Sequence, residues 1–278
     1  MTVCCCGNNK WKVAGMDSAA ERVAALLLAF GRRGTTGDHS VSDLARAVGR
    51  ERSQVSRMLQ ALGRGGLVEQ DSHTKRYRLS WNMLVLAAGA GDGSLLRAAR
   101  PVLRALVART GEVALLSVQR GNRSLTVLRE ESNQSLRAGG WVGRSSPLHC
   151  TASGRALLFD TDDDLVAELV AADLTTPMSG LSAPRTIEDV LERLRIERDR
   201  GYSMASEEVE IGLTSVGVPV RTPAGELVGV INVSGPTSRM INRLDDAARR
   251  LRTAATAIEG TLGRIPPAQT ALPAPDGA

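Results

Sequence analysis

Residues 38–80, DHSVSDLARAVGRERSQVSRMLQALGRGGLVEQDSHTKRYRLS, combine two short amphipathic helices with a polar hairpin. Ser40 can cap the first helix, and Asp43 stands three residues later, where a capping box places its acidic partner. Gly49 supplies the tight turn before the second helix. The second helix and the two strands of the hairpin are expected at 53–62, 67–70 and 76–79. This order of elements predicts a winged helix-turn-helix.

The outward face of the second predicted helix carries side chains that can read DNA. Arg and Gln can bond guanine and adenine edges bidentately in the major groove, and basic side chains on a wing can contact phosphates. The expected contact residues are Arg50, Arg52, Ser53, Gln54, Ser56, Arg57, Lys75 and Arg76. A small helical domain without a nucleic-acid role would explain the helices, but not these side chains. We therefore expect this segment to bind double-stranded DNA.

The basic excess of the chain lies in the same region. Residues 1–90 hold 13 of the 35 Lys and Arg residues and 7 of the 30 Asp and Glu residues, which leaves 22 basic against 23 acidic residues in 91–278. A basic surface binds phosphates through the release of counterions. The charge distribution therefore favours DNA as the partner of the N-terminal part.

Length and composition suggest a protein of two domains. A chain of 278 residues with 42% hydrophobic residues can bury a sizeable core. No stretch approaches the roughly 20 apolar residues that span a bilayer, and the N-terminus lacks the apolar region of a signal peptide. We expect a cytoplasmic protein without a membrane partner.

The cysteines do not form a metal-binding pattern. Cys4, Cys5 and Cys6 are consecutive and Cys150 is isolated, whereas a zinc site needs spaced pairs of ligands. We therefore expect no metal and no cofactor.

The hydrophobic patterns divide the chain into segments. Trp81–Ala90 is apolar nearly all round and is expected to be a linker helix that is buried against a partner subunit. Beyond it, helices alternate with strands, one of them expected at 135–142, which is typical of an α+β domain with a mostly antiparallel sheet. The expected segments are a disordered extension at 1–15, a DNA-binding domain at 16–80, the linker at 81–93, an effector-binding and oligomerisation domain at 94–263, and a disordered tail at 264–278.

Two blocks of the C-terminal part resemble a known family. VGRSSPLHCTASGRALLFD (142–160) and GYSMASEEVEIGLTSVGVPVRTPAGELVGVINVSGPTSRM (201–240) are similar to the two signature blocks of IclR-type bacterial transcription regulators. The resemblance spans about 16–263 and includes the order of winged helix and linker helix. It implies a GAF-like effector-binding domain, homodimers or homotetramers, and control by small metabolites.

The resemblance also implies the positions of the effector contacts. Matched position by position, they are Ala152, Ser153, Ala205, Ser215, Asn232 and Ser234. Glyoxylate- and pyruvate-type members have Asp at the Ala205 position, so a larger organic acid is expected here. From the residues themselves, a helix start at 152 favours an anion, and Asn232 and Ser234 share one face of a strand. Local hydrogen bonds at strand ends are the alternative use of these polar groups.

The function expected from these features is a sequence-specific transcriptional regulator, a repressor rather than an activator, with a near-palindromic operator and a small carboxylate effector. One alternative is an architectural DNA-binding protein that binds no ligand. Another is an enzyme that uses Cys150 with His149 as its base. Adjacent side chains of an extended segment project apart, however, so we do not expect His149 to deprotonate Cys150.

Overall fold

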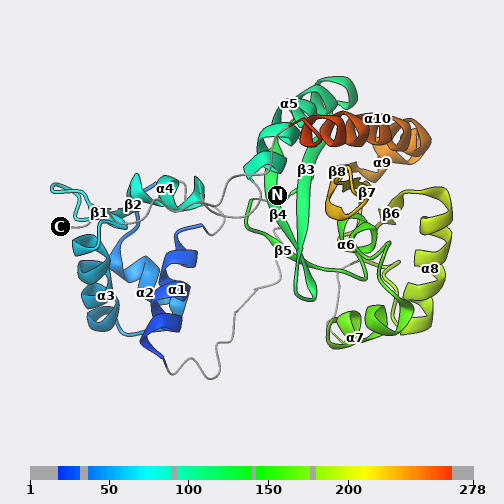
Figure 1. The fold of residues 1–278 in the computed structure, drawn as a ribbon. Coiled ribbons are helices and arrows are strands. Elements are labelled where there is room, and N and C mark those ends of the chain that lie inside the picture. The colour runs from blue at the N-terminus through cyan, green and yellow to red at the C-terminus, as the bar shows by residue number, and fades with distance from the viewer. Residues whose placement is uncertain (1–17, 32–36, 89–92, 140–141, 176–179, 265–278) are drawn as a thin grey trace. The chain divides into compact units, whose positions relative to one another are not determined.

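The computed structural model of the 278-residue chain describes residues 18–31, 37–88, 93–139, 142–175 and 180–264. The chain divides into two compact units between residues 90 and 91, and each unit is described by itself. The extension expected at 1–15 and all but the first residue of the tail expected at 264–278 lie outside the described residues (Figure 1).

The first unit is a winged helix-turn-helix, as the sequence predicts. Its elements are α1 (Ala19–Ala29), α2 (Val41–Val48), α3 (Arg52–Arg64), β1 (Val68–Gln70), β2 (Tyr77–Leu79) and α4 (Asn82–Ala88). Capping boxes begin α1 and α2, where Ser18 pairs with Glu21 and Ser40 pairs with Asp43. Each box satisfies backbone N–H groups that a helix start leaves unpaired. Local sequence therefore fixes where both helices begin.

The core of the first unit is formed by apolar side chains from its three long helices and the hairpin. The buried members are Leu26, Ala29, Phe30, Leu44, Ala45, Val55, Leu59, Leu62, Val68 and Tyr77. The turn after α3 contains two consecutive glycines of different conformation. Gly65 keeps a right-handed conformation, and Gly66 alone has a positive φ of 70°. Glycine is suited to that position because it has no Cβ.

The described part of the second unit forms a six-stranded sheet in the order β5-β4-β3-β8-β7-β6, with every neighbouring pair antiparallel. Its strands are β3 (Val113–Arg120), β4 (Arg123–Glu130), β5 (Ser145–Pro147), β6 (Ser203–Ser206), β7 (Leu213–Arg221) and β8 (Leu227–Pro236). Its helices are α5 (Gly93–Thr110), α6 (Ala152–Leu157), α7 (Asp163–Leu174), α8 (Ile187–Arg200), α9 (Thr237–Met240), the 3-10 helix η1 (Ile241–Arg243) and α10 (Leu244–Leu262). The unit is an α+β domain with an antiparallel sheet, as predicted.

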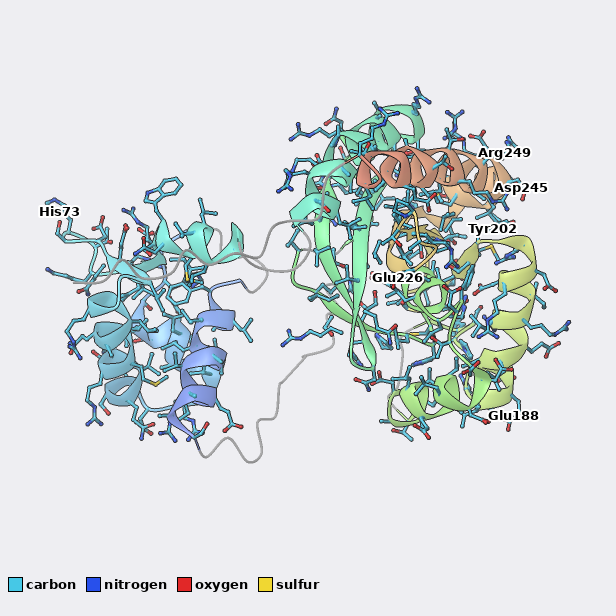
Figure 2. All side chains as sticks on the ribbon, in the orientation of Figure 1. His73, Glu188, Tyr202, Glu226, Asp245 and Arg249 are labelled. Atoms are coloured by element: carbon cyan, nitrogen blue, oxygen red, sulfur yellow. The ribbon has the colours of Figure 1, made fainter. Side chains whose placement is uncertain are left out.

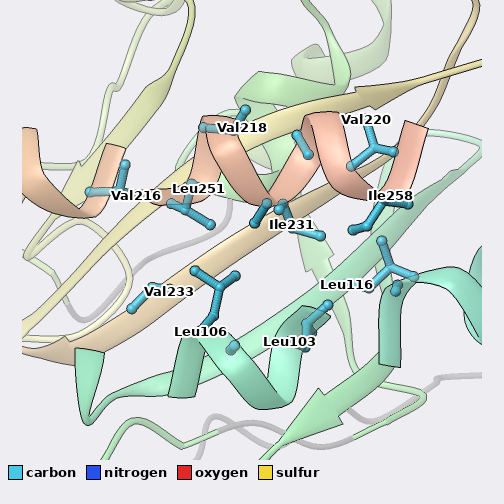
Figure 3. Close-up of a cluster of buried hydrophobic side chains, with 14 of the residues drawn as sticks. Leu103, Leu106, Leu116, Val216, Val218, Val220, Ile231, Val233, Leu251 and Ile258 are labelled. Carbon is cyan, nitrogen blue, oxygen red and sulfur yellow. The ribbon is translucent and has the colours of Figure 1, made fainter. Parts of the chain in front are cut away.

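Helices cover both faces of this sheet (Figure 1). Helices α5 and α10 pack side by side on one face, where Leu103 and Leu251 meet the strand residues Val216 and Ile231 in the main core (Figure 3). Each such side chain contributes about 1.5–3 kcal/mol when it is fully buried. Helix α6 contacts the other face through β7, β8 and β6. That second face carries polar side chains at several positions, among them Asn232 and Ser234.

The strand expected at 135–142 is not present. Residues 131–139 form no strand, and positions 140–141 lie outside the described residues. Side chains, and not a neighbouring strand, donate to carbonyl groups of this segment. Among them, Arg239 donates to the carbonyl of Leu136 at 2.8 Å, and Arg129 donates to that of Ala138 at 3.3 Å. Ala138 is buried against Val113 and Leu115. The segment therefore crosses the sheet face as a strap, which we define as residues 131–139.

Candidate functional site

The predicted base-reading residues lie on α3 outside its buried stripe. Val55, Leu59 and Leu62 face the core. Arg52, Ser53, Gln54 and Arg57 are exposed, Ser56 is half-buried, and Arg50 is exposed in the turn before the helix. The helix therefore presents Arg and Gln side chains to the outside of the unit, as the spacing predicts.

The wing is a short hairpin whose turn is fixed by one acidic side chain. Asp71 accepts hydrogen bonds from the backbone N–H groups of His73 and Thr74 at 2.9 and 2.6 Å and from the Thr74 hydroxyl. These bonds, those to Thr74 first, hold the pKa of Asp71 below its ordinary value. Lys75 is exposed and adopts the left-handed region at φ 56°. Figure 2 shows His73 at the tip of the hairpin.

Arg76 differs from the simple phosphate contact that the sequence predicts. Its Nε donates to the carbonyl of Asp38 at 2.9 Å, and its Nη2 lies 3.7 Å from the Asp43 carboxylate. The guanidinium therefore braces the wing against the start of α2. Since the side chain keeps 45% of its exposure, a phosphate contact remains a prediction.

Helix α4 and Trp81, the residue before it, present large apolar side chains to solvent in the single chain. Trp81, Leu84, Val85 and Leu86 are 78%, 60%, 71% and 58% exposed. Monomeric proteins rarely expose a contiguous apolar patch of this kind without a partner. The linker at 81–93 is described only in part, because residues 89–92 lie outside the described ranges.

The predicted effector residues of three strands share one face of the sheet. Ala205 of β6 pairs with Ser215 of β7, and Ser215 pairs with Ser234 of β8. Directly opposed residues of an antiparallel pair point to the same side. Ala205 and Ser234 are buried, and Ser215 is half-buried. The register therefore brings together three residues that lie far apart in sequence.

Asn232 belongs to the next row on the same face. It pairs with Leu115 of β3 on one side and with Gly217 of β7 on the other. Its Nδ2 donates to Oγ of Ser234 at 3.2 Å, whereas its buried Oδ1 has no hydrogen-bond partner in the part of the chain that the structure describes. Because buried polar atoms are nearly always paired, this carbonyl oxygen is a candidate contact for a bound ligand.

The start of α6, with Ala152 and Ser153, lies against the same face. The Thr151 hydroxyl caps the helix by accepting from the backbone N–H of Gly154 at 2.9 Å. Oγ of Ser153 lies 3.2 Å from Oγ of Ser124 on β4. An added Cβ at Gly217 would lie 3.0 Å from the Ala152 carbonyl oxygen, so glycine allows the close approach of α6 to β7. The six predicted effector residues are therefore brought to one region of the unit.

A buried ion network fixes α6 in this position. Arg155 is fully buried, and its guanidinium bonds to Glu197 of α8 at 2.9 and 3.0 Å and to Glu208 at 2.6 and 3.0 Å. Burial alone would lower the pKa of Arg155, but attraction to Glu197 and then Glu208 raises it above its ordinary value. Burial raises the pKa of Glu208, against the opposing effect of Arg155. The network also reaches β6 at Met204. Arg155 donates to the carbonyl group of Met204, and the backbone N–H of Met204 donates to Glu197 at 2.9 Å.

Arg129 is a further residue of this face, and sequence reasoning does not single it out. It pairs with Leu115 on the side opposite Asn232, and its side chain is only 10% exposed. Its Nε and Nη2 donate to Glu131 at 2.7 and 2.9 Å. Its buried Nη1 has no hydrogen-bond partner within the described ranges. In sequence it stands where the alternation of β4 places the less buried side chains, so no local signal marks it.

Two surface hollows of this unit contain none of the six predicted effector side chains. One, of about 380 Å³, includes Arg155, Arg193 and Met204 in its lining, and the other, of about 460 Å³, lies beside Val118 and Leu227. We favour the buried sheet face over these hollows as the ligand site, because the unpaired polar atoms of Asn232 and Arg129 lie there.

The environment of Cys150 does not suit a nucleophile. The residue is fully buried, and burial raises the pKa of its thiol to about 12. His149 is buried too, which lowers its pKa. A thiol with that pKa is almost entirely protonated near neutral pH, whereas the thiolate is the reactive form.

In the described ranges, no group of three or more His, Cys, Asp and Glu side chains is placed to hold a metal ion. Cys4, Cys5 and Cys6 lie outside those ranges. Of the helices that the structure describes, none is both long and apolar enough to cross a membrane.

Comparison with known proteins gives consistent matches over both units. A family model for the C-terminal domain of the bacterial transcriptional regulator IclR matches residues 90–260, and one for the IclR helix-turn-helix domain matches residues 19–72. The transcriptional repressor AllR of Salmonella typhimurium is 29% identical over 254 residues, which cover 90% of this chain and 91% of AllR. The transcriptional regulator KdgR of Dickeya chrysanthemi is 28% identical over 259 residues, which cover 91% of this chain and 85% of KdgR.

Solved structures show the same fold. An IclR homolog from Microbacterium hydrocarbonoxydans, complexed with 4-hydroxybenzoate, matches with a TM-score of 0.76 at 23% identity, over 89% of this chain and 100% of that chain. An IclR transcriptional regulator from Alicyclobacillus acidocaldarius matches with a TM-score of 0.74 at 22% identity, over 88% and 98%. Because the C-terminal family model alone covers more than half of the sequence, this chain belongs to the IclR family of bacterial transcriptional regulators.

Proposed function

We propose that this regulator binds a specific DNA operator through α3 and the wing. The observation that carries the proposal is the exposure of Arg52, Gln54 and Arg57 on a helix whose other face is fixed in the core. Side chains of these types can read guanine and adenine in the major groove. Arg50, Ser53 and Ser56 complete the base-facing set, and Lys75 with Arg76 supports it from the wing.

The protein acts as a homodimer or a dimer of dimers in this proposal. The apolar side chains of α4 need a cover, and a second copy of the same helix offers the matching surface. A two-fold symmetric dimer reads two half-sites in opposite orientations, so the operator should be near-palindromic. DNA as the partner also implies that the protein works in the cytoplasm.

The effector is proposed to be a small organic acid that binds beneath α6. Ala152, Ser153, Ala205, Ser215, Asn232 and Ser234 supply its surroundings, and three serine hydroxyls and an amide offer hydrogen bonds. Support comes from the Microbacterium structure of the same fold, which was solved with a carboxylate, 4-hydroxybenzoate. An apolar Ala205 widens the site on the β6 side and favours an acid larger than glyoxylate.

Repression is the proposed mode of control, since the AllR relatives are repressors by name. The main competing function is architectural DNA binding without a ligand. A thermal-shift screen separates the two, because a ligand that binds the native state raises its apparent stability. We disfavour catalysis at Cys150, given the burial and the raised pKa of its thiol.

The test of the proposal uses DNA sites selected in vitro by the full-length protein. Fluorescence anisotropy then compares the wild type with Arg57→Ala on a selected site and on a scrambled site. We expect Arg57→Ala to lose about 1–3 kcal/mol on the selected site and to show relaxed sequence preference. Arg195→Ala, which removes the same charge from the exposed face of α8, is the control and should bind as the wild type does. Unchanged affinity of Arg57→Ala for the selected site would refute the assignment.

A further inference from the structure

Two unpaired polar atoms lie on the sheet face that the strap crosses. Nη1 of Arg129 and Oδ1 of Asn232 are both buried without a hydrogen-bond partner among the described residues. Unpaired polar atoms are unfavourable in the interior and are uncommon there. Both residues pair with Leu115, one from each side, so their side chains share its face.

The register fixes the scale of the space between these atoms. Neighbouring strands lie about 4.8 Å apart, so the backbones of Arg129 and Asn232 are separated by about 10 Å across β3. The floor between them is apolar, since Leu115 and Val113 lie there and Ala138 of the strap covers them. A group that bridges the two polar atoms therefore needs an apolar middle.

The charge at the Arg129 end favours an anion. Glu131 accepts from Nε and Nη2 of Arg129 and lies 3.2 Å from Nε of Arg137. The hydrogen bonds from Arg129, in first place, hold the pKa of Glu131 below its ordinary value, so the carboxylate is ionised. Two guanidinium groups thus face one carboxylate, which leaves a positive charge in excess. The unused Nη1 is the part of Arg129 that an added carboxylate can bind.

The Asn232 end requires a different group. Its Nδ2 already donates to Ser234. The unpaired Oδ1 is a carbonyl oxygen and can only accept a hydrogen bond. A hydroxyl group supplies the missing donor. An ether oxygen or a second carboxylate does not.

We propose that the effector is a hydroxy acid whose carboxylate binds Nη1 of Arg129 and whose hydroxyl donates to Oδ1 of Asn232. Its apolar body lies over Leu115 and Val113. The inference rests on the proposed effector site beneath α6 and deepens it, because it places the carboxylate at Arg129 rather than at the helix start. The strap forms no strand pairing from 131 to 139, so the acid can take the place of Ala138 over Leu115 without breaking the sheet.

The first test varies the ligand and leaves the protein unchanged. Isothermal titration calorimetry of the full-length protein compares 4-hydroxybenzoate, 3-hydroxybutanoate and 6-hydroxyhexanoate with their methyl ethers and primary amides. We expect at least one hydroxy acid to bind, and its ether and its amide each to bind about tenfold or more weakly. Binding by none of the three hydroxy acids would overturn the ligand class. Equal affinity of the acid and its amide would overturn the role of Arg129.

The second test varies the protein and uses the hydroxy acid that binds best. Arg129→Gln should remove most of the preference for the acid over its amide, and Arg129→Lys should restore part of it, because it retains the charge. Asn232→Ala should remove the preference for the hydroxyl over the methyl ether. The ratio of affinities within each pair of ligands distinguishes a ligand contact from a structural role. General destabilisation of the protein would weaken the binding of both ligands of a pair alike.

Arg120→Gln is the matched control, because Arg120 is an exposed arginine at the end of β3 that takes no part in the proposed contacts. It should leave both preferences unchanged, and thermal unfolding of each variant reports whether the fold is retained. An unchanged acid-to-amide ratio in folded Arg129→Gln would refute the proposal. Operator binding is measured in parallel, so a protein that binds its operator but no hydroxy acid disproves this inference while the proposed regulation of DNA stands.

Discussion

The outward face of α3 and the face of the sheet beneath α6 hold their candidate side chains in opposite ways. On α3 the polar residues are exposed, and the fold depends on the apolar stripe behind them. On the sheet, Asn232 and Ser234 are buried, bond to each other, and lie next to the main core. Substitutions on α3 should therefore change binding while leaving stability alone, whereas substitutions beneath α6 should change both.

The largest effect that would test this contrast is expected at Arg155. Arg155→Met removes the buried partner that Glu197 and Glu208 share and leaves each carboxylate with one partly exposed arginine. The free energy of unfolding of the second unit should therefore fall by up to about 3–5 kcal/mol. Chemical denaturation followed by circular dichroism measures the change. Arg195→Met on the exposed face of α8 should alter stability by less than about 0.5 kcal/mol. A loss below about 1 kcal/mol for Arg155→Met would show that the network does not hold this unit together.

A second prediction concerns α4. Its exposed side chains are apolar, whereas the exposed side chains of α3 are polar. If a second copy covers α4, Leu84→Asp buries a carboxylate without a partner and costs several kcal/mol of association. Light scattering at micromolar concentration should then detect monomers, whereas Leu84→Met should remain associated. An unmodified protein that is already monomeric at that concentration contradicts the proposed assembly.

Ser234→Ala should have a moderate effect. The change removes the hydroxyl that accepts from Asn232 and one proposed contact to the effector, so affinity for the best-binding acid should fall by about 0.5–1.5 kcal/mol, or roughly threefold to tenfold. Calorimetry measures the affinity, and Ser238→Ala at an exposed position of α9 is the control. Affinity for DNA without the acid should not change. If Ser234→Ala weakened DNA binding as strongly as acid binding, the two surfaces would not be separable as argued.

The smallest effect is expected at the wing. Lys75→Ala should weaken binding to all DNA sequences alike and reduce the salt dependence of affinity by about one phosphate contact. Anisotropy titrations over a range of salt concentrations measure this slope for selected and scrambled sites. Arg57→Ala serves as the comparison, because it should act mainly on the selected site. A sequence-dependent loss in Lys75→Ala would assign base reading to the wing.

The contrast between the two faces also explains what the sequence could predict. Ser40 and Asp43 are three residues apart, and Val55, Leu59 and Leu62 follow the helical period, so the winged helix is specified by near neighbours. Antiparallel alternation likewise predicts the common face of Asn232 and Ser234. Their partners across the sheet came from the family resemblance, because register between distant strands is not visible in either strand alone.

The parts that sequence reasoning missed depend on contacts between distant residues. Arg155 lies 42 residues from Glu197 and 53 from Glu208, and in sequence it looks like an ordinary solvent-facing arginine of a short helix. The strap overlaps residues 135–142, where the sequence pattern predicts a strand. Its carbonyl groups bond instead to Arg239 and Arg129, and no local pattern announces those donors.

The side chains that bond to the backbone of Met204 also cover part of an edge of the sheet. Among the strands that the structure describes, β6 pairs only with β7, so its other side is a sheet edge. A foreign strand can add to such an edge and start aggregation. At Met204 the outward N–H is held by Glu197 and the outward carbonyl by Arg155. An incoming strand would have to displace two buried charges to pair there. The network that positions α6 thus also protects the sheet from growing, and an Arg155 variant should be prone to form intermolecular sheets.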